Sequence, residues 1–313
     1  MLERLLKKLN KLILKNDSGR INFIVDTLCS MGFESKGGSF AVHRLAEEIA
    51  KRGHNVYVFN DPFYPHENIS VIPTVQNKFD DGWYSTYQWE GFSFDPEKTI
   101  SIYTQNTWGN PFGTKHNCRW ILHDYEESQW STFSDSDLIY NYGSFRVPEN
   151  TTQEKLTVFD YKLDLYKNLS LDRKGFCHII HKFTPDWGYD FLSNFGSEDL
   201  TSLLKEGRFD DLSFKFNQFE YLLTFDSKSY ITTAATLCGC KAIILNPDPE
   251  KTPLEYRLEN PIQMCGVSYG WDDLEWSNKT LSLSRSNIET LEKIDSKTID
   301  SFVLNWEKKI YNG

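Results

Sequence analysis

Apolar residues along the chain follow two patterns that alternate as an α/β protein requires. Residues 21–26 and 55–59 are short apolar runs, which predicts buried strands. Between them, four apolar residues recur at helical spacing: Val42, Leu45, Ala46 and Ile49. Lys51, Arg52 and Gly53 then end the predicted helix, with cations in its last turn and a glycine after it. This strand–loop–helix–strand unit favours a parallel sheet.

The same alternation continues through the rest of the chain. Further apolar runs predict strands at residues 99–103, 119–123, 137–141, 176–180, 219–225 and 241–245. Helices are expected over part of 188–206 and over 230–237. Because residues 142–172 are polar, we place a domain boundary there, with one domain over 1–165 and a second over 166–290.

The tail of the chain contains one strongly amphipathic segment. Five apolar residues share one helical face: Ile299, Phe302, Val303, Trp306 and Ile310. A helix that is apolar on one side must bury that side, so we expect residues 291–313 to close the fold as a packed helix.

Composition narrows the class of protein. The chain has 313 residues, 39% of them hydrophobic and 25% charged, enough for two domains of ~150 residues. A net charge of −10 argues against a broad nucleic-acid interface, so no nucleic-acid partner is expected. No apolar run approaches the ~18 residues of a membrane-spanning helix. The six cysteines lack zinc-ligand spacing, which favours reduced thiols and a cytoplasmic location.

Residues 1–15 have the pattern of a short, basic amphipathic helix. We favour a helix that packs on its own domain or on a partner, because a single short helix binds membranes weakly. The alternative is a helix that makes weak, peripheral contact with a membrane surface.

A glycine-rich segment separates the first predicted strand from the helix. Residues 32–39 nearly spell a phosphate loop, but Gly38 stands where that loop needs lysine, so NTP hydrolysis is not expected. No G-x-G-x-x-G dinucleotide fingerprint is present either. Gly37 and Gly38 would let the backbone approach a ligand at a helix start, which favours anions. The alternative is a plain tight turn.

A second candidate site lies where the strand at 219–225 leads into the helix at 230–237. Asp226 and Ser227 follow the strand, and Ser229 precedes the helix. Such a helix start can hold a pyrophosphate, with Asp226 or Ser227 near a ribose or sugar. The alternative is a capped surface helix, since aspartate and serine are ordinary caps.

Two further strand ends carry reactive side chains. Lys182 follows the predicted strand 176–180 at its carboxyl end, where ligands gather in open α/β sheets. His123 and Asp124 close the strand that begins at Arg119. The ordinary alternatives are a solvated lysine and a hydrogen-bonded histidine at a strand end.

Seven short segments together resemble a GT-B glycosyltransferase over roughly residues 20–310. Gly37-Gly38 and the later Arg52-Gly-His-Asn-Val56 are similar to the opening of the family's first domain. Four further segments resemble the G-N-P-L, R-W-L-L, G-V-A-Y-G and D-D-x-x-W segments of a bacterial and viral subgroup: residues 109–112, 119–122, 266–270 and 272–276. Residues 237–240 resemble the A-x-x-C-G segment behind the donor-binding helix.

This resemblance implies an α/β fold of two Rossmann-like domains with parallel sheets and a last helix, residues 291–313, that crosses back to the first domain. It implies a nucleotide-sugar donor on the second domain, a glycan or other hydroxyl acceptor on the first, and neither a metal ion nor another cofactor. The candidate donor-binding residues are Gly37, Gly38, Lys182, Asp226, Ser227, Ser229, Tyr230, Ile231 and Thr232. An inverting enzyme also needs a general base; His123 is the first candidate, followed by Glu34 and Asp124.

One family feature is missing from the sequence. Many retaining members carry E-x7-E, whereas Asp226 takes the first position here and Ala234 the second. Two alternatives therefore stay open: a catalytically inactive GT-B-like binding or scaffold protein, and another sugar-nucleotide-processing α/β enzyme. No D-x-D triplet lies at the end of a predicted strand, and the pairs Asp80–Asp81 and Asp272–Asp273 are expected in solvated loops.

Overall fold

The fold was established from a computed structural model of the chain. The residues it describes are 20–26, 37–59, 69–72, 94–104, 107, 109–122, 130–143, 145, 147, 153–180, 184–227 and 229–312. The predicted helix over residues 1–15 lies outside them. The chain divides into two compact units, Met1–Asp160 joined by Asp295–Gly313, and Tyr161–Ile294. Among the described helices, none is both long and apolar enough to cross a membrane.

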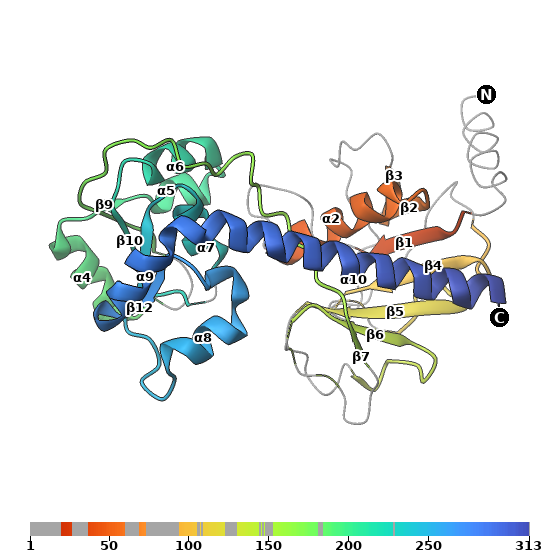
Figure 1. The fold of residues 1–313 in the computed structure, drawn as a ribbon. Helices are drawn as coiled ribbons and strands as arrows, with labels where there is room; N and C mark the ends of the chain where they lie inside the picture. The colour runs from red at the N-terminus through yellow and green to blue at the C-terminus, as the bar shows by residue number, and fades with distance from the viewer. Residues whose placement is uncertain are drawn as a thin grey trace. The chain divides into compact units, whose positions relative to one another are not determined.

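The described strands of the first unit form a seven-stranded sheet in the order β3-β2-β1-β4-β5-β6-β7 (Figure 1). All neighbouring strands run parallel. Their bounds are β1 Asn22–Asp26, β2 Asn55–Phe59, β3 Ile69–Ile72, β4 Thr99–Tyr103, β5 His116–Ile121, β6 Leu138–Asn141 and β7 Gln153–Lys155. The strand order reverses between β1 and β4, which makes their carboxyl ends the topological switch point of this sheet.

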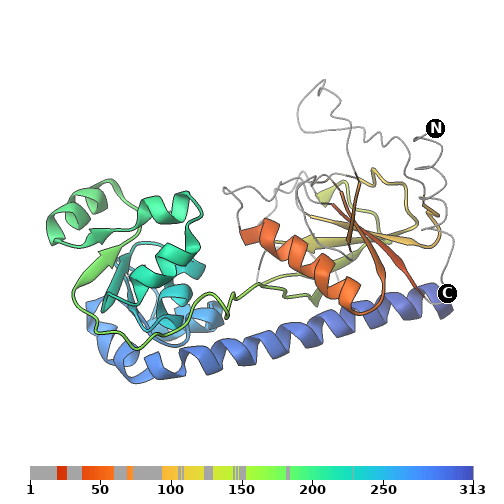
Figure 2. The ribbon, with the colours of Figure 1, turned by 90° about the horizontal axis from the view of Figure 1, so that it is seen from above.

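Two helices cover one face of the first sheet. They are α2 (Gly37–Lys51) and the part of α10 (Ser284–Asn312) from Asp295 onward, whose axes are inclined to each other in Figures 1 and 2. Arg52, just after α2, pairs with Asp300 of α10. The apolar stripe of α2 and four tail residues are buried in one core with the strands: Ile299, Phe302, Val303 and Trp306. Ile310 packs against this core while partly exposed. The amphipathic tail therefore buries the face that its sequence predicted.

The opposite face of the first sheet has a smaller aromatic core. Ile24, Tyr57, Phe59 and Tyr103 from three strands meet Phe112, which lies in the segment between β4 and β5. The rings of Tyr103 and Phe112 stack with their centroids 5.3 Å apart. Part of this face is thus covered by an irregular segment that is anchored by its aromatic side chain.

The described strands of the second unit form a five-stranded parallel sheet in the order β12-β11-β10-β8-β9. Their bounds are β8 Phe176–His178, β9 Glu198–Asp199, β10 Tyr221–Thr224, β11 Lys241–Ile244 and β12 Val267–Tyr269. The helices are α4 Asp186–Phe195, α5 Thr201–Lys205, α6 Phe209–Phe216, α7 Tyr230–Leu237, α8 Pro253–Glu259 and α9 Leu274–Thr280. α7 is deeply embedded, since every residue from Ile231 to Leu237 is buried.

The α/β class with two parallel sheets and a last helix packed on the first unit is confirmed. The predicted strands 55–59 and 99–103 and the predicted helix 230–237 match β2, β4 and α7 residue for residue. Two differences have a physical reason. β7 has the sequence Gln-Glu-Lys and is exposed, so it carries no apolar signal. α10 begins before the predicted 291, at Ser284, and its first turns carry a single large apolar residue, Ile288, so they show no apolar stripe.

Candidate functional site

The second sheet reverses its strand order between β8 and β10. From β8 the chain leads outward to β9, then returns to β10 and continues to β11 and β12. Open α/β sheets bind ligands beyond the carboxyl ends of the strands at such a reversal. Asp226 follows β10 by two residues, and Lys182 follows β8 along the chain. Asp226 therefore lies just beyond the carboxyl end of a switch-point strand, whereas Lys182 follows the other strand in the sequence only.

The chain between β10 and α7 brings an acidic side chain and a capped helix start together. Asp226 is only 3% exposed, and its N–H donates to the Thr224 hydroxyl at 3.2 Å. Ser227 is half-buried. Ser229 is the N-cap of α7, and its hydroxyl accepts from the N–H of Ile231 at 3.2 Å. The ordinary role of Ser229 as a helix cap is thus present.

A buried glutamine, Gln263, holds the start of α7 in place through hydrogen bonds of its side chain. Gln263 is fully buried, and its side-chain amide donates to the Ser229 carbonyl at 3.2 Å and to the Thr232 hydroxyl at 2.8 Å. The carbonyl oxygen of the same side chain accepts from the Tyr269 hydroxyl at 2.8 Å. The position of the helix start is therefore set by a satisfied polar network.

The first-turn side chains of α7 point into the unit. Ile231 is 5% exposed and Thr232 is fully buried. The Tyr230 hydroxyl donates to the Tyr161 carbonyl, and its ring packs edge-on against Tyr166. At Thr232, contact with a ligand would have to come from the backbone N–H group, since N–H groups of the first turn lack intrahelical acceptors. The N–H of Ile231 already donates to the Ser229 hydroxyl, so a ligand would have to displace this cap.

The position of the missing second glutamate is also buried. Ala234 lies on the second turn of α7 and is fully buried, and so is its neighbour Thr233, whose hydroxyl donates to the Ile262 carbonyl at 3.0 Å. A carboxylate at position 234 would lose its hydration, which is costly. The second turn of α7 is thus built to pack rather than to hold a ribose.

Several predicted site residues cannot be placed. His123, Asp124, Glu34 and Lys182 lie outside the described residues. Within the described part of the chain, no group of three or more His, Cys, Asp or Glu side chains could hold a metal ion.

The glycine pair predicted at a helix start does open α2, which begins at Gly37. A Cβ atom added at Gly38 would meet Leu122 Cδ1 at 3.9 Å, an ordinary van der Waals distance. The protein itself therefore leaves space for a side chain at position 38.

The switch point of the first sheet holds a buried ionic network that the sequence pattern did not reveal. Asp26 ends β1 and is fully buried, and its carboxylate accepts a hydrogen bond from the Thr107 hydroxyl. The Arg119 guanidinium donates to the carbonyls of Thr107, at 3.1 Å, and of Gly109. Arg119 also pairs with Asp137. The G-N-P and R-W-I-L segments that carry the family resemblance are thus hydrogen-bonded neighbours.

Burial perturbs the acid at the centre of this network. It raises the pKa of Asp26 to about 6, because the carboxylate loses its hydration, while the Thr107 hydrogen bond and the positive charge of Arg119 oppose the rise. In the sequence, the one feature that distinguishes Asp26 is its place as an acid at the end of a predicted apolar strand. Only the fold brings Thr107 and Arg119 against it.

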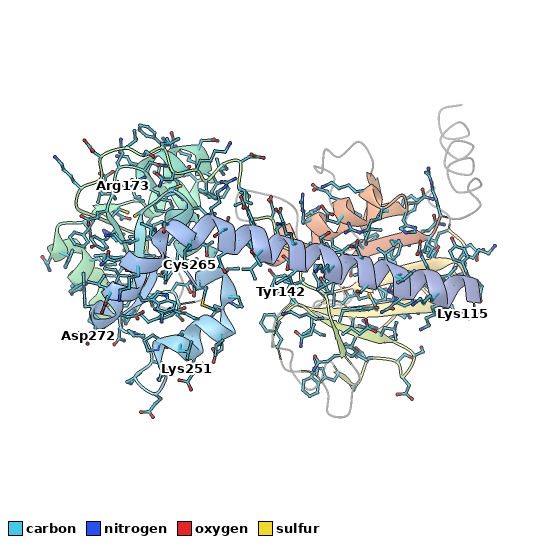
Figure 3. All side chains as sticks on the ribbon, viewed as in Figure 1. Lys115, Tyr142, Arg173, Lys251, Cys265 and Asp272 are labelled. Atoms are coloured by element: carbon cyan, nitrogen blue, oxygen red, sulfur yellow. The ribbon has the colours of Figure 1, made fainter. Side chains whose placement is uncertain are left out.

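A second buried arginine explains the D-D-x-x-W segment. Arg257 is 3% exposed, pairs with Asp273 and lies with its Cζ 4.5 Å from the centroid of the Trp276 ring. The Asp273 carboxylate also accepts from the Tyr269 N–H at 2.9 Å. The expectation of a solvated loop is therefore wrong for Asp273, whereas Asp272 is exposed (Figure 3). This segment closes the end of β12.

Comparisons with known proteins find likeness in structure alone. No family model and no curated protein matches the sequence. The chain is similar in structure to AviGT4, a glycosyltransferase involved in avilamycin A biosynthesis, with TM-score 0.48, 9% identity, and 94% of this chain and 99% of that chain covered. It is also similar in structure to the catalytic domain of starch synthase IV from Arabidopsis thaliana, bound to ADP and acarbose. Here the TM-score is 0.42 and the identity 11%, with 95% of this chain and 100% of that chain covered.

A third similar structure is WaaG, a glycosyltransferase involved in lipopolysaccharide biosynthesis, with TM-score 0.36, 10% identity, and 94% of this chain and 100% of that chain covered. All three TM-scores are below 0.5. The fold assignment therefore stands on the strand order, the register and the packing described above.

Proposed function

We propose that the chain is a glycosyltransferase that moves a sugar from a nucleoside-diphosphate-sugar donor to a glycan or another hydroxyl acceptor without a metal ion. In this proposal the second unit binds the donor and the first unit binds the acceptor. The motif resemblance to GT-B glycosyltransferases and the two open parallel sheets, each with its own switch point, support it.

The observation that carries the proposal is the carboxyl edge of the second sheet at β8 and β10. There Asp226 and the capped start of α7 follow β10. Lys182 comes after β8 in the sequence, and we propose that it reaches the same edge. A helix start offers N–H groups and a positive dipole end to an anion, and lysine supplies the countercharge that a metal would otherwise provide. This combination suits a diphosphate.

The chemistry required is stabilisation of the departing nucleoside diphosphate. We assign it to Lys182 and to the N–H groups of the first turn of α7, from Tyr230 to Thr232, with the diphosphate displacing the Ser229 hydroxyl from the N–H of Ile231. Asp226 and Ser227 are the proposed partners of the ribose or the sugar. If transfer inverts the anomeric centre, the acceptor hydroxyl needs a general base, for which His123 is our first candidate. A retaining reaction would not need this base.

A specific observation favours a second candidate function. Ala234 stands where many retaining members carry an acid, and its surroundings are fully buried. A GT-B-like binding or scaffold protein without catalysis would tolerate this change. Another sugar-nucleotide-processing enzyme, which keeps the donor site and lacks an acceptor, is the third candidate.

Calorimetric titration with UDP, GDP, ADP, dTDP and CDP tests the donor site directly. One of them should bind, and Lys182→Ala should weaken that binding by ~1–3 kcal/mol, the range of a charge-assisted hydrogen bond. Lys174→Ala is the matched control, because Lys174 is exposed and precedes β8 at its amino end. Its affinity should equal that of the wild type.

The outcomes separate the three candidates. Diphosphate binding with turnover of the matching sugar donor on a p-nitrophenyl glycoside supports the transferase. Binding without turnover on any acceptor supports the binding protein. Conversion of the sugar donor without an acceptor supports the third candidate, and absence of binding to all five diphosphates contradicts the donor site.

A further inference from the structure

The segment after β4 is tied at its start to two neighbouring strands. The Thr107 hydroxyl donates to the carboxylate of Asp26, at the end of β1. The Arg119 guanidinium, from β5, donates to the carbonyls of Thr107 and Gly109. The Thr107 N–H donates to the Thr104 carbonyl at 3.2 Å. The hydroxyl, the carbonyl and the N–H of Thr107 are therefore all hydrogen-bonded, which restrains its backbone.

The side chains that hold this segment form one row across the switch point of the first sheet. The strand register pairs Tyr103 with Arg119 across β4 and β5, and Val25, the residue before Asp26, with Ile102, the residue before Tyr103. Asp26, Tyr103 and Arg119 therefore lie in one row. The Tyr103 hydroxyl donates to the Asn110 side chain at 2.6 Å and accepts from the N–H of Phe112 at 3.1 Å. The row thus spans the carboxyl ends between which a sheet of this order binds its ligand.

The charged side chains of Asp26 and Arg119 are not needed to cover the sheet. Phe112 already covers the apolar face by packing with Tyr103 and Phe59. Burying Asp26 and Arg119 carries a desolvation cost that well-packed apolar residues of similar volume would avoid. What the charged side chains provide in addition is directional hydrogen bonding, which fixes backbone groups in space.

We propose that Asp26 and Arg119 are positioning residues that hold the backbone of Thr107 and Gly109 at the carboxyl edge of the first sheet for recognition of the hydroxyl acceptor. This inference rests on the proposed transferase function and names the acceptor-side element of that function. The two residues act through Thr107 and Gly109 and need not touch the acceptor themselves.

Steady-state kinetics of Asp26→Asn and Thr107→Val test the proposal, with p-nitrophenyl glycosides as acceptors and released nucleoside diphosphate as the readout. Both changes nearly keep the side-chain shape but remove the charge or the hydroxyl of the contact. Each should raise the acceptor KM about tenfold, the effect of losing one charge-assisted hydrogen bond, with the donor KM unchanged. Thr107→Ser keeps the hydroxyl and should restore the acceptor KM.

Thr114→Val is the matched control at the other end of the same segment. Thr114 is 2% exposed, and its hydroxyl bonds to Ser101 and Asn117, away from the switch point. If Thr114→Val raises the acceptor KM as much as Thr107→Val, or if Asp26→Asn leaves it unchanged, the positioning role is overturned while the transferase stands. If the wild-type chain binds no nucleoside diphosphate, the proposed function fails and this inference fails with it.

Discussion

Arg119 and Asp137 form a buried ion pair, with Nε and Oδ2 2.7 Å apart and each side chain only 1% exposed. The guanidinium also lies 4.7 Å from the Tyr103 ring centroid and 4.8 Å from that of Phe133. Taking both charges out of water offsets much of their attraction, so the intact pair adds little net stability. Removing one partner is different, because it leaves the other charge buried without its directly paired counter-ion.

Asp137→Ala should therefore lower the free energy of unfolding by ~3–5 kcal/mol. Urea unfolding followed by tryptophan fluorescence measures the change. The control is Asp135→Ala, at an exposed aspartate two residues earlier, which should shift the free energy by less than ~0.5 kcal/mol. A loss below ~1 kcal/mol for Asp137→Ala would mean that Arg119 is neutralised in another way.

The stability of the first unit should fall as the pH rises through about 6. The pKa of Asp26 is raised to about 6 in the folded chain, above its ordinary value of 3.8, so the folded state holds the proton more tightly than the unfolded state. The resulting stabilisation is complete below the unfolded pKa and is lost as the pH passes the folded pKa. A shift of about two pKa units corresponds to ~3 kcal/mol.

Asp26→Asn isolates this contribution, because asparagine stays neutral. The variant should match the wild type in free energy of unfolding at about pH 4 and exceed it by up to ~3 kcal/mol at about pH 7.5. Asp164→Asn, at an exposed aspartate, should show no such divergence. Parallel pH curves for the wild type and Asp26→Asn would contradict the raised pKa.

Sugar transfer should survive EDTA. The GT-B resemblance implies a metal-free donor site, with Lys182 and the start of α7 supplying the countercharge. The chain does contain a D-x-D sequence at Asp135 and Asp137. However, this sequence precedes β6, and the Asp137 carboxylate already forms an ion pair with Arg119. Dialysis against EDTA should leave the rate of nucleoside diphosphate release unchanged; complete loss that Mg²⁺ or Mn²⁺ restores would contradict the metal-free mechanism.

Local patterns in the sequence predicted the elements whose apolar positions have a clear period. α2 and α7 begin or end next to glycine or a cap. β2 is apolar after Asn55, and β4 carries Ile100, Ile102 and Tyr103, so the bounds of these elements are encoded within a few residues. β9 has two exposed acidic residues and gives no such signal. Its pairing with β8 depends on tertiary context.

In the candidate sites too, the sequence predicted only contacts between residues that are neighbours in the chain. Asp226 and Ser229 could be predicted because a strand end and a helix cap are neighbours in the chain. The contact between Asp26 and Thr107 joins residues that are 81 positions apart, and no periodicity links them. Gln263, which anchors α7 from a 3₁₀ turn, was missed for the same reason.

Trp306 should be a major source of stability in the first unit. Its side chain is fully buried in the core that α10 shares with α2 and the strands, and Phe302, also fully buried, lies one turn earlier. Trp306→Ala removes a large apolar volume that rigid strands cannot refill, so it should cost ~3–5 kcal/mol in free energy of unfolding. Leu304→Ala, at a residue 47% exposed on the same helix, should cost less than ~1 kcal/mol.

Truncation tests the same helix as a whole. Without residues 298–313, the apolar surfaces of α2 and of Phe23 and Tyr140 would lose the cover of Phe302, whose ring centroid lies 6.1 and 4.8 Å from theirs. An uncovered apolar surface of this kind favours aggregation. The truncated chain should therefore melt at a lower temperature and elute as oligomers in size-exclusion chromatography. A monodisperse truncated chain with the full-length melting temperature would show that the tail is dispensable for the core.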